Sequence, residues 1–503
     1  MTYLNSRTKN RLAFNLFGIA VVIFWFCMIG LLVKKNHVQS SPSGFVSDVQ
    51  TPKIDSAQRD WKEITLKGKK VGYTVNLVNP FQEGYFIQEE IFLKLNLMGL
   101  GGGVYTVTRS RVDKNFLLKN FQFSMTSGAV SFKLSGRVEN ELLFVESGKG
   151  KDRRTQRIKL SRPPMIGASM GHFFKSKNLR VGETFRLPLF DPSTMAQKEV
   201  EIKVAARERI DIRGVPYDAL RLEAAMWGQN MRFWVDKEGA TLKEEGFMGL
   251  TLTKSSAARA PRDIEKDGDM DFYDLTAVRV EKSLPHPTRL KYIRLKLSNI
   301  EHMTAELEAL NSERQTFREG VLEIKQESPP FTSSYRLPHD FGDEMRSFLR
   351  PEFNIESDHE EILRQAGRIS GNLKNSVSVA RKMMSWVYLN LDKRPVVSIP
   401  SAIEVLRKKV GDCNEHATLL TALLRASGIP AKLSIGLVYT RDKFYYHAWN
   451  EAWLGKWVSM DATLNQMPAD ATHIKLVEGN LEKQVEIAGF IGTMKIEVID
   501  YKK

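Results

Sequence analysis

The stretch VGDCNEHATLLTALLRASGIPAKL, Val410 to Leu433, decides how the C-terminal part of this 503-residue chain is expected to fold. Asp412 and Glu415 have the spacing of a capping box, so a helix is predicted to start with Cys413 in its first turn. The positive end of a helix dipole favours a thiolate at that position. The two carboxylates oppose this effect unless they are occupied with capping.

One face of this helix is predicted to be buried. Three apolar residues follow Cys413 at spacings of four, three and four: Ala417, Leu420 and Leu424. Gly428 and Pro430 end the helix. Upstream, the amphipathic segment SVARKMMSWVYLNL, residues 378–391, predicts another helix, and Ser401 has capping-box spacing to Glu404 ahead of a third.

The segment after the helix, KLSIGLVYTRDKFYYHAWNEAWLGKWVSMDATL at 432–464, predicts three strands joined by tight turns. A three-residue loop at 454–456 pairs Trp453 with Trp457. His447 and Asp461 then point to the same face of the sheet, one diagonal step apart and within side-chain reach. The sequence therefore predicts an imidazole oriented by a carboxylate, with the Cys413 thiol opposite them.

Three blocks in this region, GDCNEHATLLTALLRASGIPA, YYHAWNEAWL and WVSMDAT, resemble the transglutaminase-like superfamily of papain-like cysteine enzymes, in its bacterial branch. The resemblance covers about Asn354 to Glu478, with helical lead-in segments upstream. It implies that Cys413 is the nucleophile, His447 the base and later the acid, and Asp461 the residue that orients the imidazole. Ala462 departs from the proline that the family often carries after the aspartate.

The resemblance implies acyl transfer through a thioester, and we expect hydrolysis of a peptide or amide bond. A cross-linking transglutaminase, in which an amine resolves the acyl-enzyme, is the alternative, as is a scaffolding or binding module that keeps the fold without turnover. Neither a cofactor nor a metal is predicted. A zinc site built from Cys413, His416, His447 and Asp461 is conceivable from the residue types, but the Cys-x-x-His spacing is weak support.

The N-terminal part suggests a membrane anchor. Residues 12–33 are apolar apart from Asn15 and long enough to cross a bilayer, which favours a retained transmembrane helix over a cleaved signal peptide. The flanking basic residues favour a cytoplasmic segment at 1–11, and 34–59 is predicted to be a stalk. The expected location is the bacterial inner membrane, single-pass, with a periplasmic body in which Cys413 is the only thiol.

Period-two segments bounded by glycine and proline predict an antiparallel β-rich domain at 60–258. A linker and mixed segment is expected at 259–340, and the transglutaminase-like α+β domain at 341–503. The fold class is thus α+β with an N-terminal transmembrane helix. The formal charge of +15 suits an anionic partner such as a cell-envelope polymer. The expected partners are membrane lipid, through 12–33, and a peptide or protein substrate, without nucleic acid.

Overall fold

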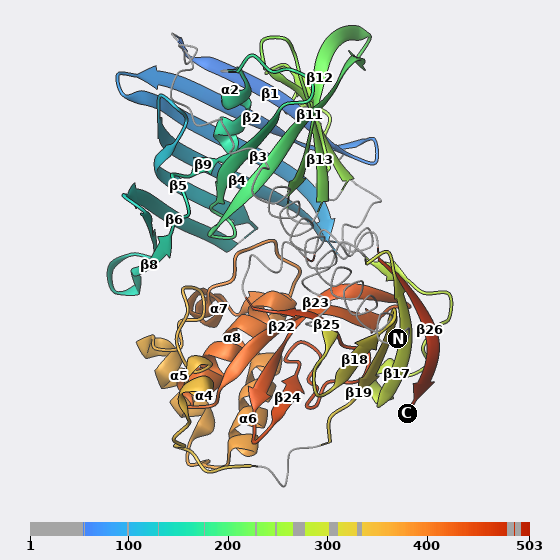
Figure 1. Cartoon of the computed structure of the whole chain (residues 1–503). Helices are drawn as coiled ribbons and strands as arrows, with labels where there is room; N and C mark the ends of the chain where they lie inside the picture. The colour runs from blue at the N-terminus through green and yellow to red at the C-terminus, as the bar shows by residue number, and fades with distance from the viewer. Residues whose placement is uncertain are drawn as a thin grey trace, which may run out of the picture. The chain divides into compact units, whose positions relative to one another are not determined.

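The fold is described from a computed structural model of the chain, shown in Figure 1. It describes residues 54–503 apart from 55, 98–99, 129, 176, 227–228, 247–248, 265–276, 301–309, 329–333, 480–486 and 488–493. The predicted cytoplasmic segment 1–11, the transmembrane helix 12–33 and almost all of the stalk 34–59 lie outside the described residues.

A 15-stranded sheet occupies the first half of the described chain, coloured blue to green in Figure 1. Its order is β8-β7-β6-β5-β4-β3-β2-β1-β15-β14-β13-β12-β11-β10-β9, antiparallel throughout except for β9 beside β10. The strands are β1 Gln58–Leu66, β2 Lys69–Phe81, β3 Gly84–Leu97, β4 Leu100–Asp113, β5 Leu118–Ser127, β6 Val130–Glu139, β7 Leu142–Ser147, β8 Arg154–Lys159, β9 Met165–Ile166, β10 Thr184–Asp191, β11 Ala196–Ile212, β12 Val215–Met226, β13 Gln229–Val235, β14 Thr241–Glu245 and β15 Leu250–Ser255. The connections contain the short helices η1 Gly150–Asp152, η2 Gly167–Ser169 and α2 Met170–Lys175.

Alternating side chains explain why this region forms a sheet. In the middle of β11 buried residues alternate with exposed ones, at Val200, Ile202 and Val204, and phenylalanines from several strands meet in one apolar core. Tight turns join successive strands, as between β1 and β2, where Lys67 and Gly68 both have positive φ. Glycine adopts that conformation without steric cost. Local turns and alternation thus produce a meander in which most neighbours in sequence are neighbours in space.

A second sheet, with helices packed against it, forms much of the C-terminal part. Its order is β16-β23-β22-β25, and β24 pairs with β23. The strands are β16 Val278–Arg279, β22 Ala431–Thr440, β23 Lys443–Trp453, β24 Trp457–Met460 and β25 Ile474–Glu478. The helices are α4 Asp343–Ser347, α5 Glu360–Ser370, α6 Ser376–Asn390, α7 Ala402–Lys408 and α8 Cys413–Ala426, after η4 Pro287–Arg289. The strands β20 Asp392–Lys393 and β21 Val410–Gly411 form a small parallel pair.

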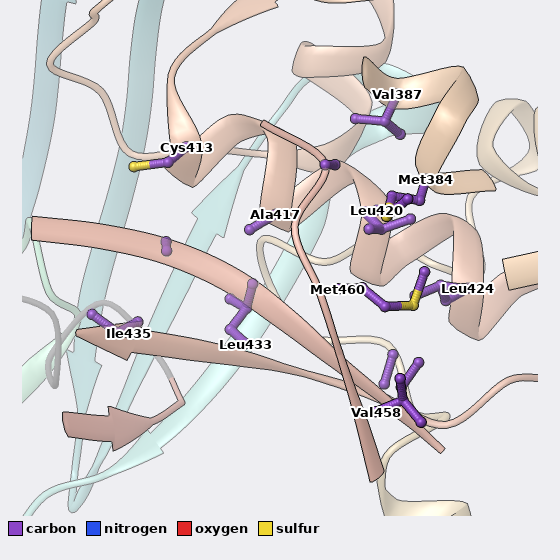
Figure 2. Close-up of a cluster of buried hydrophobic side chains, with 14 of the residues drawn as sticks. Met384, Val387, Cys413, Ala417, Leu420, Leu424, Leu433, Ile435, Val458 and Met460 are labelled. Atoms are coloured by element: carbon purple, nitrogen blue, oxygen red, sulfur yellow. The ribbon is translucent and has the colours of Figure 1, made fainter. Parts of the chain in front are cut away.

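Helix α8 is held against β23 by polar and apolar contacts. Asn450 of β23 donates from Nδ2 to the carbonyl oxygen of Ala417 (2.9 Å) and to Thr421 Oγ1 (2.7 Å). Figure 2 shows the predicted apolar face of α8 among buried side chains of α6, β22 and β24, with Cys413 at the end where the helix starts. The face predicted from the spacing Cys413, Ala417, Leu420 and Leu424 is buried throughout.

A four-stranded sheet, β18-β19-β17-β26, is tied to the second sheet by buried hydrogen bonds. Its strands are β17 Tyr292–Ser298, β18 Gln315–Arg318, β19 Val321–Lys325 and β26 Lys495–Lys502. Arg314 donates to Ser459 Oγ (2.6 Å) and to the carbonyl oxygen of Asp470 (2.8 Å). Gln315 donates to the carbonyl oxygen of Lys475 and accepts from its backbone N–H. These hydrogen bonds hold the segment 459–475, which contains Asp470, against the four-stranded sheet.

The predicted fold class, α+β with an N-terminal transmembrane helix, is wrong. In the described residues, strands contain more residues than helices. The reason is that the period-two pattern continues beyond the first sheet into a second group of strands, β17, β18, β19 and β26, while the helices are short. Among the residues described, no helix has both the length and the apolar character needed to span a membrane. The predicted location and partners are not tested by the structure and stay predictions.

Candidate active site

Cys413 is the first residue of α8, as the capping box predicts. Asp412 is the N-cap and accepts from the backbone N–H of Asn414 (2.9 Å), while Glu415 Oε2 accepts from the Asp412 backbone N–H (2.9 Å). Gly411 allows this close turn, because a Cβ built there would lie 2.3 Å from the Cβ of Glu415. The position of Cys413 is therefore set by short-range interactions among five consecutive residues, 411–415.

The thiol of Cys413 lies against β23. It is 6% exposed, and its sulfur accepts a hydrogen bond from the backbone N–H of Ala448, the residue after His447. Tyr446, the residue before His447, donates to Asn414 Oδ1 (3.1 Å). Both neighbours of His447 in the strand thus contact the first turn of α8, and this brings His447 to the thiol end of the helix.

Burial raises the pKa of the Cys413 thiol well above its ordinary value, and the carboxylates of Asp412, Glu415 and Asp461 add to the rise. The Ala448 N–H acts in the opposite direction. Burial and the nearby Asp412 also raise the pKa of Glu415 well above its ordinary value. Capping occupies both acidic groups, yet the helix dipole does not prevail, and the resting thiol is neutral.

His447 and Asp461 are in direct contact. The hairpin has the register expected from the sequence, with Trp453 opposite Trp457, and Asp461 directly follows the last paired residue of β24. His447 Nε2 lies 2.7 Å from Asp461 Oδ2, and both side chains are buried. The ring of Trp449 stacks on that of His447 with 6.2 Å between centroids. The imidazole is thus oriented by a carboxylate on one side and an indole on another.

Asp461 accepts hydrogen bonds at both oxygens. Oδ1 accepts from the backbone N–H groups of Thr463 (2.7 Å) and Leu464 (2.9 Å), while Oδ2 faces His447 and His473. Burial works to raise the pKa of Asp461, but the two imidazoles prevail and hold that pKa below its ordinary value. The carboxyl group is therefore ionised although it has no contact with solvent.

His473 is the site residue that sequence reasoning missed. It precedes β25, is fully buried, and lies 3.0 Å from Asp461 Oδ2 through Nε2 and 3.2 Å from Asp470 Oδ1 through Nδ1. Burial acts to lower its pKa, but Asp470 and Asp461 raise the pKa of His473 to about 9. A signal was present in the repeated Asp-Ala-Thr at 461–463 and 470–472, each with its aspartate accepting from the threonine N–H.

The alternative zinc site is not assembled. His416 directs Nδ1 to the carbonyl oxygen of Asp412 (2.7 Å) within its own helix. In the described ranges, the ligand atoms that gather within 4.8 Å of one another belong to His447, Asp461 and His473, and Cys413 is not among them. Both imidazole Nε2 atoms approach the same carboxylate oxygen, at 2.7 Å for His447 and 3.0 Å for His473.

Residues 364–462 match the family model described as transglutaminase-like superfamily. This part of the chain is similar to the transglutaminase-like superfamily. The matched range contains Cys413, His447 and Asp461 and ends before Asp470 and His473. The resemblance to a family of thiol enzymes is therefore confirmed for the domain. Residues 64–245, within the 15-stranded sheet, match a second model, described as a protein of unknown function, DUF3108.

Three solved structures show more distant similarity. A candidate cysteine protease from Cytophaga hutchinsonii is 19% identical over 42% of this chain and 86% of its own, with a TM-score of 0.28. A β-barrel-like protein of a domain of unknown function, DUF1849, from Brucella abortus is 14% identical over 40% and 96%, with a TM-score of 0.31. A candidate protease from Parabacteroides distasonis is 10% identical over 71% and 69%, with a TM-score of 0.20. All three TM-scores are low, so these similarities do not define the fold. None of the curated proteins matches the chain.

Proposed function

We propose that the transglutaminase-like domain is a cysteine-dependent hydrolase of peptide or amide bonds. The proposal rests above all on the buried hydrogen bond between His447 and Asp461, made by the strand whose backbone contacts the thiol of Cys413. In this proposal Cys413 is the nucleophile, His447 the general base and then the general acid, and Asp461 the group that orients the ring.

The protonation states support a general-base mechanism. The resting thiol is neutral because it is buried among carboxylates. His447 binds Asp461 through Nε2, which leaves Nδ1 to take the thiol proton. That transfer converts a neutral pair into a thiolate and an imidazolium, without changing the net charge of the site. Asp461 stabilises the new imidazolium, and the Ala448 N–H together with the start of α8 stabilises the thiolate.

Acyl transfer then proceeds in two stages. The thiolate attacks the carbonyl carbon, and the oxygen gains a negative charge near the Cys413 backbone N–H, which has no carbonyl partner one turn earlier in the helix. His447 returns its proton to the leaving amine as the C–N bond breaks. Water then attacks the thioester, His447 takes one proton from it, and the carboxylic acid leaves as the thiol is restored. Asp461 stays ionised throughout.

The thiol can be tested without knowing the substrate. In the full chain with Cys27→Ser, Cys413 is the only thiol, so the rate constant of iodoacetamide alkylation reports on it alone. We expect alkylation to persist well below a free cysteine pKa of about 8.5, and to slow by about 10²-fold or more at pH 7 in His447→Ala. A matched control is His286→Ala, at an exposed position, which should leave the rate unchanged.

Two results would contradict the proposal. An equal alkylation rate in His447→Ala and its parent would show that the imidazole does not activate the thiol, and the scaffolding alternative would replace the enzyme. To separate hydrolysis from cross-linking, the protein is incubated with a capped peptide library and a fluorescent primary amine. New carboxyl termini support hydrolysis, whereas incorporation of the amine above hydrolysis would make the protein a transglutaminase.

A further inference from the structure

A chain of buried charged groups continues beyond Asp461 and is not used by the proposed reaction. His473 lies between two aspartates, with Nε2 toward Asp461 Oδ2 (3.0 Å) and Nδ1 toward Asp470 Oδ1 (3.2 Å). It is fully buried, and Asp470 is 2% exposed. The family match ends before both residues.

The hydrogen bonds that the two carboxylates accept indicate where the protons of this buried charged cluster lie. Asp470 Oδ1 also accepts from the backbone N–H and the hydroxyl of Thr472, and its Oδ2 accepts from Gln466 Nε2 (2.8 Å). Asp461 accepts two bonds at each oxygen. The two oxygens that face the ring, Asp461 Oδ2 and Asp470 Oδ1, already accept hydrogen bonds from other groups and have no room for a proton of their own, so the ring nitrogens are the donors in both contacts. Both ring nitrogens of His473 must therefore carry hydrogen, which makes the ring an imidazolium.

We propose that His473 is a positioning residue of the thiol site: its imidazolium, held by Asp470, keeps Asp461 ionised and directs Oδ2 to His447. This inference rests on the proposed function, since it assigns the role through the pair that activates Cys413. The ring of His473 approaches that of His447 edge-on, with 5.7 Å between centroids, so it contacts the carboxylate without taking the place of the catalytic imidazole.

The charge balance explains why a cation is needed there. Asp461 and Asp470 both touch one ring, and without a positive charge between them two buried carboxylates would repel each other. One of them would then hold a proton at a higher pH. The pair of His473 and Asp470 is neutral as a unit, so Asp461 keeps its charge for the imidazolium that forms on His447. Arg314 donates to the Asp470 carbonyl oxygen (2.8 Å) and is itself paired with Glu327 (3.3 Å).

The first test compares the pH dependence of Cys413 alkylation in the full chain with Cys27→Ser, with and without His473→Gln. The glutamine amide donates to one aspartate and carries no charge. We expect the acid limb of the rate profile to move up by about one pH unit or more, so that the rate falls at least about tenfold near pH 5.5 and much less at pH 8. A uniform loss at every pH, or superimposable profiles, would overturn the inference.

A matched control removes another buried histidine. His172 is 3% exposed and bonds to Asn76 in the first sheet, so His172→Gln deletes an equivalent ring elsewhere. Its profile should match that of the parent. His447→Ala separates the two proposals: if this change leaves alkylation unaffected, the proposed function fails, whereas a loss in His447→Ala with an unmoved profile in His473→Gln contradicts the positioning role alone.

A second test needs no variant of His473 and so does not depend on whether that variant folds. The full chain, labelled with ¹⁵N-histidine, is examined by long-range ¹H–¹⁵N correlation at pH 8, where an ordinary histidine with a pKa of about 6.5 is neutral. Of the nine histidines, we expect one ring with both nitrogens protonated. A spectrum in which all nine rings are neutral at pH 8 would refute the buried imidazolium.

Discussion

Replacing Asp461 with asparagine should be among the most costly isosteric changes in this domain. The carboxylate accepts two imidazole N–H groups at Oδ2 and two backbone N–H groups at Oδ1, at 2.7 to 3.0 Å. An amide has one oxygen and one NH₂ group. In Asp461→Asn the NH₂ must face either the two imidazoles or the two backbone donors, so donor meets donor in either rotamer.

The size of the effect follows from that count. Two of the four bonds are lost, and hydrogen bonds to charged groups contribute about 1.5–3 kcal/mol each, so unfolding should become easier by about 3–6 kcal/mol. The reaction suffers as well, because the ring of His447 loses either its acceptor or its charged partner. General-base assistance is worth about 10²–10⁴-fold, and we expect alkylation of Cys413 at pH 7 to slow by about that factor.

Urea unfolding followed by tryptophan fluorescence measures the first effect, and the alkylation rate in native buffer measures the second. The control is Asp343→Asn, the same exchange at a carboxylate whose side chain is fully exposed, which should change neither quantity. A loss of stability in Asp461→Asn no larger than in this control would refute the reasoning, because it would mean that the four hydrogen bonds are not made together.

Three further outcomes follow from the same geometry. Gly411→Ala places a Cβ 2.3 Å from that of Glu415, so it should break the capping box, lower the urea midpoint and slow alkylation; an unchanged midpoint would contradict the close approach. Leu420→Ala, in the buried face of α8, should cost about 2–5 kcal/mol in urea unfolding, and a cost below about 1 kcal/mol would show that this position is not packed. Because the pKa of His473 is raised to about 9, the contribution of its imidazolium to the free energy of unfolding is complete below about pH 6.5 and is lost as the pH rises through about 9. The urea midpoint should therefore fall over that range in the parent protein and not in His473→Gln. An equal fall in both proteins would contradict the assignment.

The parts of the site that sequence could predict are those encoded locally. The capping box that starts α8 lies within four residues, and the register of the β23–β24 hairpin follows from a three-residue loop, so both could be read without knowledge of the tertiary fold. His473 could not be read this way. Its role depends on Asp461 and Asp470 reaching it from the turn before β25, and on Arg314 holding that turn from a segment more than 140 residues earlier.

The same distinction explains the fold class. The alternation of apolar and polar residues predicted the strands of the first sheet, in which strands that follow one another in the sequence also pair. The four-stranded sheet joins β17 to β26, which begins almost 200 residues later, and the local sequence of a short alternating segment does not show which distant strand it pairs with.

The buried charges suggest why the thiol site contains more than a cysteine, a histidine and an aspartate. A thiol buried beside Asp412, Glu415 and Asp461 is neutral at rest, so in the proposed mechanism it depends on a base that acts at the moment of attack. That base is effective only while Asp461 keeps its charge, and burial alone would protonate Asp461. The imidazole of His473 supplies a positive charge next to Asp461, so the carboxyl group stays ionised in spite of its burial. Asp461 can then still accept the hydrogen bond from His447. In this proposal the reactivity of Cys413 depends on His473 and Asp470, on the far side of Asp461, which a search limited to the thiol and its nearest base would overlook.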